Sequence, residues 1–491
     1  METCTSPSLT AIVKPTYACN LGCLYCYEGG RAEACQRMSL DTLRNVITKL
    51  AQYHGSERTI HIIWHGGEPL LMGLNFFRAA VQIQQEMGPD YEFDNSIQTN
   101  GTLLSDEVLD FFQEHDFSIG TSLDGPQWLH DFTRPYANGH SSFDDILRAV
   151  SQMQERKGRG SDHSIGGGVI AILTKPVLPH LDEFYEFFRD NGISVKINPI
   201  FYAGRGATVR EKLGITPNEY GDAMVYLFDR WFYEPEYVID IDPFDLILGN
   251  LMTGEPWGCQ FGPACWDQYI AVDPRGNVHP CGRWSSEEPF SLGNLNEQDV
   301  VDVLRSPVLE QFRRERAKAA LKCRTCEFHT ICNSGCIENG YLIRQRLSDR
   351  DIYCVGYRRM FAHLREGLLA ELDKAAIPSA NGEGDSTIDV LERKVDLQRL
   401  HTPALRTVIA RRVSDDTSSI VGWDDHEKWS EYYDDHKKHV KHSEYKKYYK
   451  HNEHRKTYRE RWNRRWKDAD HKKGLFWRKH SRYSDHSDTM C

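Results

Sequence analysis

The chain has 491 residues, which is enough for two or three domains, and its 40% hydrophobic content allows a sizeable core. It has no apolar run of about eighteen residues and does not begin with a basic stretch followed by an apolar one, so neither a membrane span nor a secretory signal is expected and the predicted location is cytoplasmic. The net charge is −11 although residues 421–491 carry +6, and this acidic body argues against a nucleic-acid partner.

Short runs rich in Ile, Val and Thr alternate with helix-length segments from residue 8 to about residue 200. The expected strands are 9–14, 59–64, 96–99, 117–122, 168–173 and 195–199, and the expected helices are 40–53, 74–87, 105–115, 142–156 and 179–191. A further helix should begin at Thr216, where Pro217 and Glu219 complete a capping box. This alternation predicts a parallel α/β fold, closed or partly closed as a barrel, with its chemistry at the carboxyl ends of the strands.

Three cysteines, Cys19, Cys23 and Cys26, lie in one CxxxCxxC run directly after the first expected strand. In a reducing compartment, clustered cysteines indicate metal binding more often than disulfides. Three thiolates from one loop can hold three irons of a [4Fe–4S] cluster and leave the fourth iron open to a substrate. Zinc is the alternative, although its short sites usually come as paired CxxC elements.

This run, with aromatic Tyr25 before the third cysteine, resembles the defining motif of the radical S-adenosylmethionine (SAM) superfamily. The second expected strand ends in His65-Gly66-Gly67-Glu68-Pro69, which resembles the GGEP motif of that superfamily. The resemblance implies a partial (βα)6 barrel of the TIM type. It also implies that Gly66, Gly67 and Glu68 hold the methionine amine of SAM, whereas the alternative is an ordinary surface turn.

Two later segments, Ser122-Leu-Asp124-Gly125 and Asp131-Phe-Thr-Arg134, resemble segments that contact SAM in this superfamily. By resemblance, Ser122 would bond the ribose and Arg134 the methionine carboxylate, for which a guanidinium fork is well suited. Gln98 and Asn198, at strand ends, are weaker candidates for the same site. The alternative is a turn followed by a surface arginine.

Eight more cysteines lie between residues 259 and 354. Their spacing resembles the SPASM domain of radical SAM enzymes that modify peptides, which implies two further, fully ligated [4Fe–4S] clusters and three clusters in all. The resemblance assigns Cys259, Cys265, Cys281 and Cys336 to one cluster, and Cys323, Cys326, Cys332 and Cys354 to the other. Such clusters would conduct electrons rather than bind substrate; zinc is again the alternative.

These motifs predict four regions along the chain. Residues 1–250 would form the radical SAM barrel with connecting helices, residues 251–375 the cysteine-rich SPASM domain, and residues 376–420 a linker with a helix. Residues 421–491 would form a C-terminal extension, a basic tail rich in aromatic residues and histidines. Such a tail is expected to be disordered or helical, and the alternative is a substrate or docking arm fused to the enzyme.

The resemblance implies an oxidoreductase that uses a 5′-deoxyadenosyl radical to take hydrogen from a peptide or protein side chain, with an electron donor such as flavodoxin or ferredoxin. The predicted outcome is a cyclophane-type crosslink in a ribosomally made peptide. The alternative is the formylglycine chemistry of anaerobic sulfatase maturases, whose pattern places an Asp base after the third SPASM cysteine, where this chain has Gly282. The base is not assigned; Asp267, His279 and Glu338 are candidates. A binding protein whose clusters are only structural is the rival class.

Overall fold

The computed structural model describes residues 9–29, 35–157, 168–234, 239–286 and 288–376. Within these ranges the strands form one sheet in the order β10-β9-β8-β1-β2-β3-β4-β5-β6-β7. The strands are β1 (Thr10–Val13), β2 (Ile60–Trp64), β3 (Phe93–Gln98), β4 (Ser118–Ser122), β5 (Val169–Leu173), β6 (Val195–Pro199), β7 (Ile241–Asp242), β8 (Tyr269–Val272), β9 (Asn277–His279) and β10 (Gly293–Asn294).

Neighbouring strands from β1 to β7 are parallel, and β1 to β6 follow one another in chain order. The sheet ends at β7 on one side and at β10 on the other, so it is an open, partial barrel. The mixed α/β fold with a parallel sheet is confirmed, and all six expected strands are present within a few residues of their predicted bounds.

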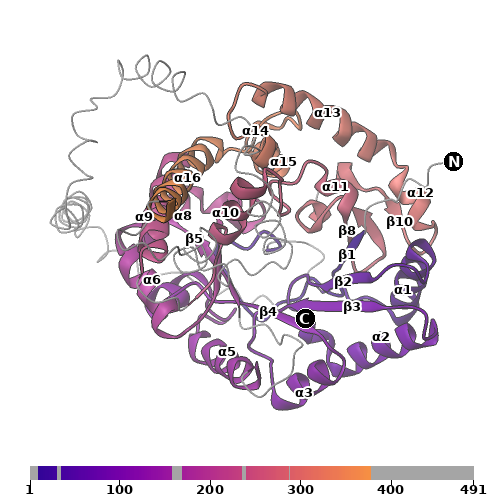
Figure 1. The fold of residues 1–491 in the computed structure, drawn as a ribbon. Helices are drawn as coiled ribbons and strands as arrows, with labels where there is room; N and C mark the ends of the chain where they lie inside the picture. The colour runs from indigo at the N-terminus through magenta and orange to yellow at the C-terminus, as the bar shows by residue number, and fades with distance from the viewer. Residues whose placement is uncertain (1–8, 30–34, 158–167, 235–238, 287, 377–491) are drawn as a thin grey trace. The chain divides into compact units, whose positions relative to one another are not determined.

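Helices join the strands and lie outside the curved sheet (Figure 1). Those of the first half are α1 (Leu40–His54), α2 (Leu74–Glu86), α3 (Asp106–Glu114), α4 (Gln127–Thr133), α5 (Phe143–Lys157), α6 (Leu181–Asp190), α7 (Arg205–Thr208), α8 (Arg210–Leu213) and α9 (Pro217–Phe232). Those of the second half are α10 (Phe244–Thr253), α11 (Cys265–Gln268), α12 (Val300–Leu304), α13 (Pro307–Cys323), α14 (His329–Cys332), α15 (Ile337–Arg344) and α16 (Cys354–Ala376). Short 3₁₀ turns are η1 (Pro69–Met72), η2 (Lys175–His180), η3 (Gly282–Ser286) and η4 (Glu288–Phe290).

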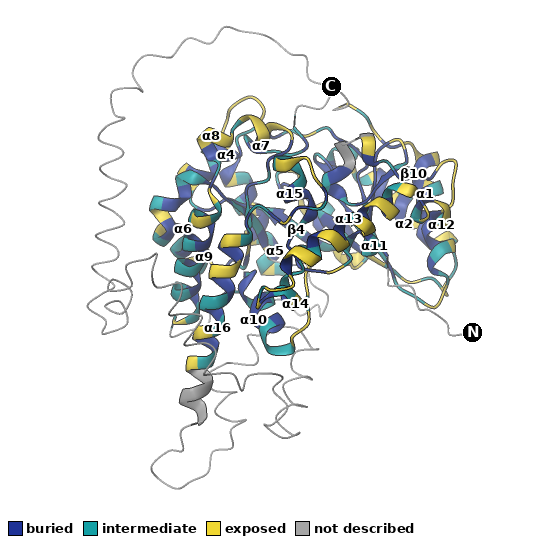
Figure 2. Ribbon diagram, turned by 90° about the horizontal axis from the view of Figure 1, so that it is seen from above, coloured by how far each residue is buried: buried dark blue, intermediate teal, exposed yellow. Residues whose placement is uncertain are grey.

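Local sequence explains where several helices begin. The Thr216 side chain accepts a hydrogen bond from Glu219 N, and the Glu219 carboxylate accepts one from Thr216 N, so the predicted capping box starts α9. The helices show buried and exposed faces side by side (Figure 2), as expected of amphipathic helices over a core. None of the helices in the described ranges is long and apolar enough to cross a membrane.

The two faces of the sheet differ in burial. Trp64, which is fully buried, packs against Phe76 and Phe77 of α2, so its face of the sheet meets the helices. Successive strand residues point to opposite faces, and the strand register therefore places one polar set on the other, concave face. This set lies at the carboxyl ends of the strands and consists of Lys14, His65, Gln98, Ser122 and Asn198.

The cysteine-rich segment contributes to the same sheet. Strand β8 pairs in parallel with β1, and β9 and β10 continue the sheet in antiparallel fashion. The expected boundary near residue 250 therefore falls within a continuous sheet, and the division into domains stays a prediction. The expected linker and tail, 377–491, lie outside the described residues, as does the fused-substrate alternative.

Candidate functional site

The first three cysteines lie on the loop that follows β1. The Cys19 sulfur accepts a hydrogen bond from Leu21 N at 3.4 Å. The pKa of Cys19 is raised to about 12, mainly by burial and in part by the neighbouring thiols of Cys23 and Cys26. Burial likewise raises the pKa of Cys23 to about 12, against the charge of Arg134, which lowers it. The loop thus brings together an exposed, a buried and a half-buried thiol (Cys19, Cys23 and Cys26), with Arg134 as the nearby cation.

The two glycines of the GGEP segment let the cysteine loop pass close to the end of β2. A Cβ on Gly67 would lie 2.3 Å from Ala18 O, and one on Gly66, whose φ is +113°, would lie 2.3 Å from Thr16 O. In their place the backbones bond directly, from Gly67 N to Thr16 O at 3.0 Å and from Glu68 N to Ala18 O at 2.7 Å. Glycine is therefore required here for contact between two loops.

Glu68 is fully buried beneath this contact. Its carboxylate accepts hydrogen bonds from Leu70 N at 2.9 Å, Thr99 Oγ1 at 2.7 Å and Asn100 N at 2.7 Å. Burial raises its pKa to about 7, although the three donors oppose that rise. A carboxylate has about four acceptor sites, so one remains for an ammonium group.

Asp124 organises the second predicted SAM segment, and the sequence analysis did not include it among the site residues. It accepts hydrogen bonds from the Tyr25 hydroxyl, from Thr133 Oγ1 at 2.6 Å and from Ile172 N at 3.1 Å, and it pairs with Arg134 Nε at 3.1 Å. The Arg134 guanidinium lies 5.2 Å from the Tyr25 ring centroid. The ion pair is made through Nε, so the terminal nitrogens could meet a carboxylate. Tyr25 and Arg134, distant in sequence, are thus brought together by one buried carboxylate.

Gln98 and Ser122 lie on neighbouring strands, β3 and β4. Gln98 Nε2 donates to Ser122 Oγ at 3.3 Å. Asn198 is half-buried near the end of β6 on the same concave face. The structure therefore joins the first two predicted residues directly and places the third on the same side of the sheet.

A polar and aromatic cluster connects the cysteine loop with the second cysteine set. Lys14 is fully buried and donates to Glu28 and to the Gly282 carbonyl. Tyr27 lies 5.4 Å from the Lys14 amine and packs edge-on against Phe201, with ring centroids 5.8 Å apart. The pKa of Tyr27 is raised by burial first and then by Glu28, while Cys26 and Cys281 also contribute, so Tyr27 lies between the two cysteine groups. The sequence analysis missed Lys14 and Glu28; a lysine in a strand-end position on the concave face was the available signal.

Four of the later thiols interact with one another. Burial raises the pKa of Cys265 to about 12, and Cys259 and Cys336 add to that rise. Burial raises the pKa of Cys281, and the charges of Glu338, Cys336 and Cys265 also raise it. Arg283 stabilises this group, because its Nη1 lies 3.9 Å from the Cys336 sulfur. The structure thus brings Cys259, Cys265, Cys281 and Cys336 together.

The other four thiols form a separate group. Burial raises the pKa of Cys323 and the charge of Arg350 lowers it, while Cys354 and Cys326 make smaller contributions that raise it. The pKa of Cys332 is raised by burial and then by Cys354, with further contributions from Cys323 and Cys326. The mutual charge effects thus link thiols within each of the two predicted sets, and the assignment of ligands to clusters stays a prediction.

The three candidate bases lie in different surroundings. Asp267 is half-buried and pairs with Arg313 Nη2 at 2.7 Å. His279 is buried on β9. Glu338 is buried, and its Oε2 lies 3.9 Å from the Cys281 sulfur. Glu338 thus lies beside a candidate cluster ligand.

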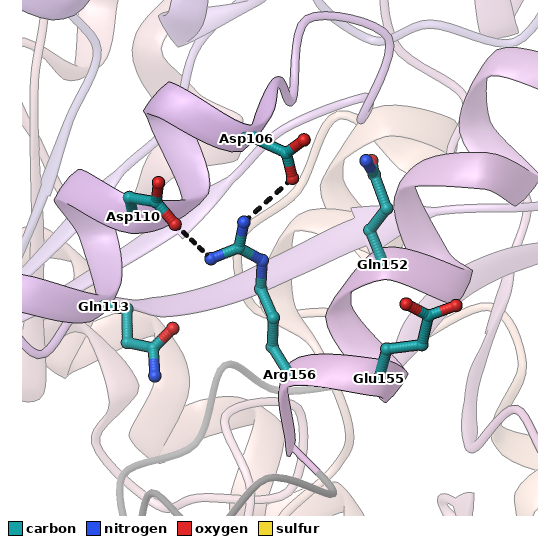
Figure 3. Close-up of a pocket in the computed structure, with 6 residues that line it drawn as sticks. All are labelled: Asp106, Asp110, Gln113, Gln152, Glu155 and Arg156. Carbon is teal, nitrogen blue, oxygen red and sulfur yellow. Dashed lines mark hydrogen bonds and ion pairs between the residues drawn. The ribbon is translucent and has the colours of Figure 1, made fainter.

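A surface pocket lies away from these groups, between α3 and α5 (Figure 3). Arg156 bridges Asp110 and Asp106 there, with an Arg156–Asp106 distance of 2.8 Å. The pocket is lined by Asp106, Asp110, Gln113, Gln152, Glu155 and Arg156. None of these was a predicted site residue, so the pocket is separate from the candidate chemistry.

Family models match two parts of the chain. The radical SAM superfamily matches residues 13–170, and the SPASM iron–sulfur cluster-binding domain matches residues 264–327. The chain thus contains a radical SAM domain and a SPASM domain. The CxxxCxxC loop, the GGEP segment and Arg134 of this radical SAM enzyme fall within the first match. The second match begins after Cys259 and ends before Cys332, Cys336 and Cys354, so these four ligand candidates depend on the geometry above.

Similar proteins agree with this family. A serine-type anaerobic sulfatase-maturating enzyme of Bacteroides thetaiotaomicron is 26% identical over 382 residues, covering 72% of this chain and 89% of the relative. A cysteine-type enzyme of the same kind from Clostridium novyi is 25% identical, covering 72% and 94%.

Two solved structures share the fold. The structure of anSMEcpe with bound AdoMet has a TM-score of 0.66 at 23% identity and covers 74% of this chain and 98% of that one. Streptococcus suis SuiB bound to the precursor peptide SuiA has a TM-score of 0.52 at 17% identity, covering 71% and 76%. The radical SAM enzyme thus has the fold of both.

The residues present fit iron–sulfur clusters. Three thiols on one loop and two groups of four thiols match one open and two fully ligated [4Fe–4S] clusters. Arg316 supports the fit, because its side chain is buried and its Nη1 has no hydrogen-bond partner among the described residues. No group of three or more His, Cys, Asp or Glu side chains in the described ranges is arranged for a single metal ion.

Proposed function

We propose that this radical SAM enzyme oxidises a side chain of a peptide or protein and holds three [4Fe–4S] clusters. The observation that carries the proposal is the separation of the eight later thiols into two groups of four, next to a loop with three. Cys19, Cys23 and Cys26 would hold the first cluster, whose open iron would bind SAM. Each group of four thiols would hold one auxiliary cluster.

SAM would lie along the concave edge of the sheet. The Arg134 guanidinium, anchored by Asp124, would meet the methionine carboxylate, and the remaining acceptor site of Glu68 would meet the ammonium. The Ser122–Gln98 pair would bond the ribose. Tyr25 would position Arg134 through Asp124. These assignments give the carboxylate and the ammonium of SAM each a partner of opposite charge.

The reaction would remove two hydrogens from the substrate. When bound, the clusters and SAM supply the 5′-deoxyadenosyl radical and an electron acceptor. One C–H hydrogen atom would pass to that radical; the substrate would then lose one electron and, to a base of this chain, one proton. Glu338 is the candidate for that base that lies beside the Cys281 sulfur, whereas Asp267 is engaged by Arg313.

The favoured outcome is a crosslink between side chains, and the observation that favours it is Gly282. The sulfatase-maturase pattern has a carboxylate at this position, whereas this chain has glycine. A Cβ there would make ordinary contacts with Ile12 and Lys14, at 3.5 to 3.7 Å. The carboxylate beside Lys14 comes from Glu28 instead. Formylglycine formation is the second candidate, and the names of the sulfatase-maturating relatives favour it.

The test is anaerobic turnover of the reconstituted enzyme with SAM, reductant and two kinds of peptide. One peptide contains aromatic residues spaced for a crosslink, and the other contains a sulfatase-type Ser or Cys. The proposal expects loss of two hydrogens from the aromatic peptide, no reaction with hydrazide, and missing fragment ions within the crosslinked ring. If only the Ser or Cys peptide reacts, and its product is a hydrazide-reactive aldehyde, the proposed crosslink is wrong and the reaction is formylglycine formation.

The electron donor and the cytoplasmic location remain predictions. Flavodoxin and ferredoxin are the donors that the resemblance implies. Either could be tested as the sole reductant in the same assay.

A further inference from the structure

Arg316 is a buried arginine on a helix whose other charged residues are exposed. It lies on α13, where Arg314 and Lys318 face solvent. The Arg316 residue is 5% exposed, and burial lowers its pKa. A buried guanidinium is costly unless acceptors or negative charges surround it. The surroundings of Arg316 therefore indicate its role.

Arg316 holds the turn that connects the two thiol groups. Its Nη2 donates to the Asn333 carbonyl and to the Gly335 carbonyl, the latter at 2.6 Å. These carbonyls lie between Cys332, which belongs to one group, and Cys336, which belongs to the other. The turn between them has positive φ at three successive residues, from 46° to 73°. The guanidinium is thus fixed at the junction of the groups.

The other terminal nitrogen, Nη1, does not bond these two carbonyls. Nη1 is buried and has no hydrogen-bond partner among the described residues. The charges that act on Arg316 are those of Cys265 and Cys336 from one group, Cys332 from the other, and Asp351. The guanidinium also lies 5.9 Å from the Trp266 ring centroid, next to Cys265. One cation therefore serves both groups.

Asp351 is the opposing charge at the same junction. It accepts hydrogen bonds from Cys336 N at 3.0 Å, Asn339 Nδ2 at 2.9 Å and Tyr353 N at 2.8 Å. Its charge acts on both Cys332 and Cys336. Without Arg316, the junction would hold eight thiolates and a buried carboxylate with less positive charge to balance them.

We propose that Arg316 is a positioning residue that sets the reduction potentials of both auxiliary clusters. The inference rests on the proposed cluster assignment. Reduction adds negative charge to a cluster, and a fixed cation nearby stabilises the reduced form. Arg316 therefore keeps both potentials higher than the thiolates and Asp351 alone would, and it makes both clusters better electron acceptors.

The test compares Arg316→Gln, Arg316→Lys and the matched control Arg314→Gln in the full-length, anaerobically reconstituted enzyme. Gln removes the charge and keeps a polar side chain, and Lys keeps the charge. The measurements are iron content and an EPR-monitored redox titration of the auxiliary clusters. The proposal predicts unchanged iron and more negative auxiliary potentials in Arg316→Gln, a smaller shift in Arg316→Lys and no shift in Arg314→Gln.

Several outcomes decide the matter. Full iron and unshifted potentials in Arg316→Gln would overturn the inference and leave the cluster assignment intact. Loss of auxiliary iron in Arg316→Gln with retention in Arg316→Lys would support a need for the charge. Loss of auxiliary iron in both variants would overturn the inference and show that Arg316 only stabilises the fold. A wild-type protein with only about four irons would instead overturn the proposed auxiliary clusters themselves.

Discussion

At the scale of single residues, buried charges that meet several partners define the site. Asp124 is fully buried and connects the cysteine loop through Tyr25, helix α4 through Thr133, strand β5 through Ile172 N, and Arg134. The sequence motif identified the segment around Asp124 but not the role of Asp124. Two of its hydrogen-bond partners, Tyr25 and Ile172, come from distant parts of the chain. The same is true of Lys14 and Arg316, whose burial depends on acceptors supplied by other loops.

Asp124→Asn tests this role with a side chain of the same shape. Removing one partner of a buried ion pair typically costs about 3 kcal/mol or more, and Arg134 would lose its anchor. We expect lower thermal stability and SAM affinity at least about tenfold weaker, measured by calorimetry. The control is Asp106→Asn, since Asp106 pairs with Arg156 at 2.8 Å on the surface and lies outside the predicted SAM segments. Wild-type SAM affinity in Asp124→Asn would refute the anchoring role.

At the scale of elements, the contact between the cysteine loop and the end of β2 fixes the loop. The hydrogen bonds from Gly67 N and Glu68 N tie the loop to a strand that the core holds rigidly. The strands themselves were predictable, because period-two burial and β-branched residues repeat along each of them. Strands β7, β9 and β10 were not, because two or three residues show no period, and β8 was not, because its last three residues are buried in succession.

Gly67→Ala should break this contact. A methyl group would lie 2.3 Å from Ala18 O and 2.4 Å from Tyr17 O, so the loop must move. We expect destabilisation of about 1–3 kcal/mol and reconstituted protein with about four fewer irons. Gly168→Ala is the control, since its Cβ would come no closer than 3.7 Å to Ser194 O. Unchanged iron in Gly67→Ala would show that the loop does not need this approach.

At the scale of the whole molecule, one sheet joins the SAM site to the cysteine-rich segment. Strand β8 lies directly beside β1, and the Lys14 amide donates to Val272 O at 2.8 Å. Cys281 follows the next strand and comes within electrostatic reach of Tyr27 in the cysteine loop. The radical SAM and SPASM domains could be predicted from cysteine spacing, and the assignment of ligands to clusters stays a prediction. The continuity of the sheet could not, because it depends on pairing between residues about 260 positions apart.

The most direct measurement of the central claim is the iron and sulfide content of the anaerobically reconstituted protein. The Cys19/Cys23/Cys26 triple Ala variant and a Cys323/Cys326/Cys332/Cys354 quadruple Ala variant would be measured beside it. The account predicts about twelve irons per chain in the wild type and about eight in each variant. About four irons in the wild type, absent from the triple variant and unchanged in the quadruple variant, would contradict the account and the auxiliary clusters on which it depends.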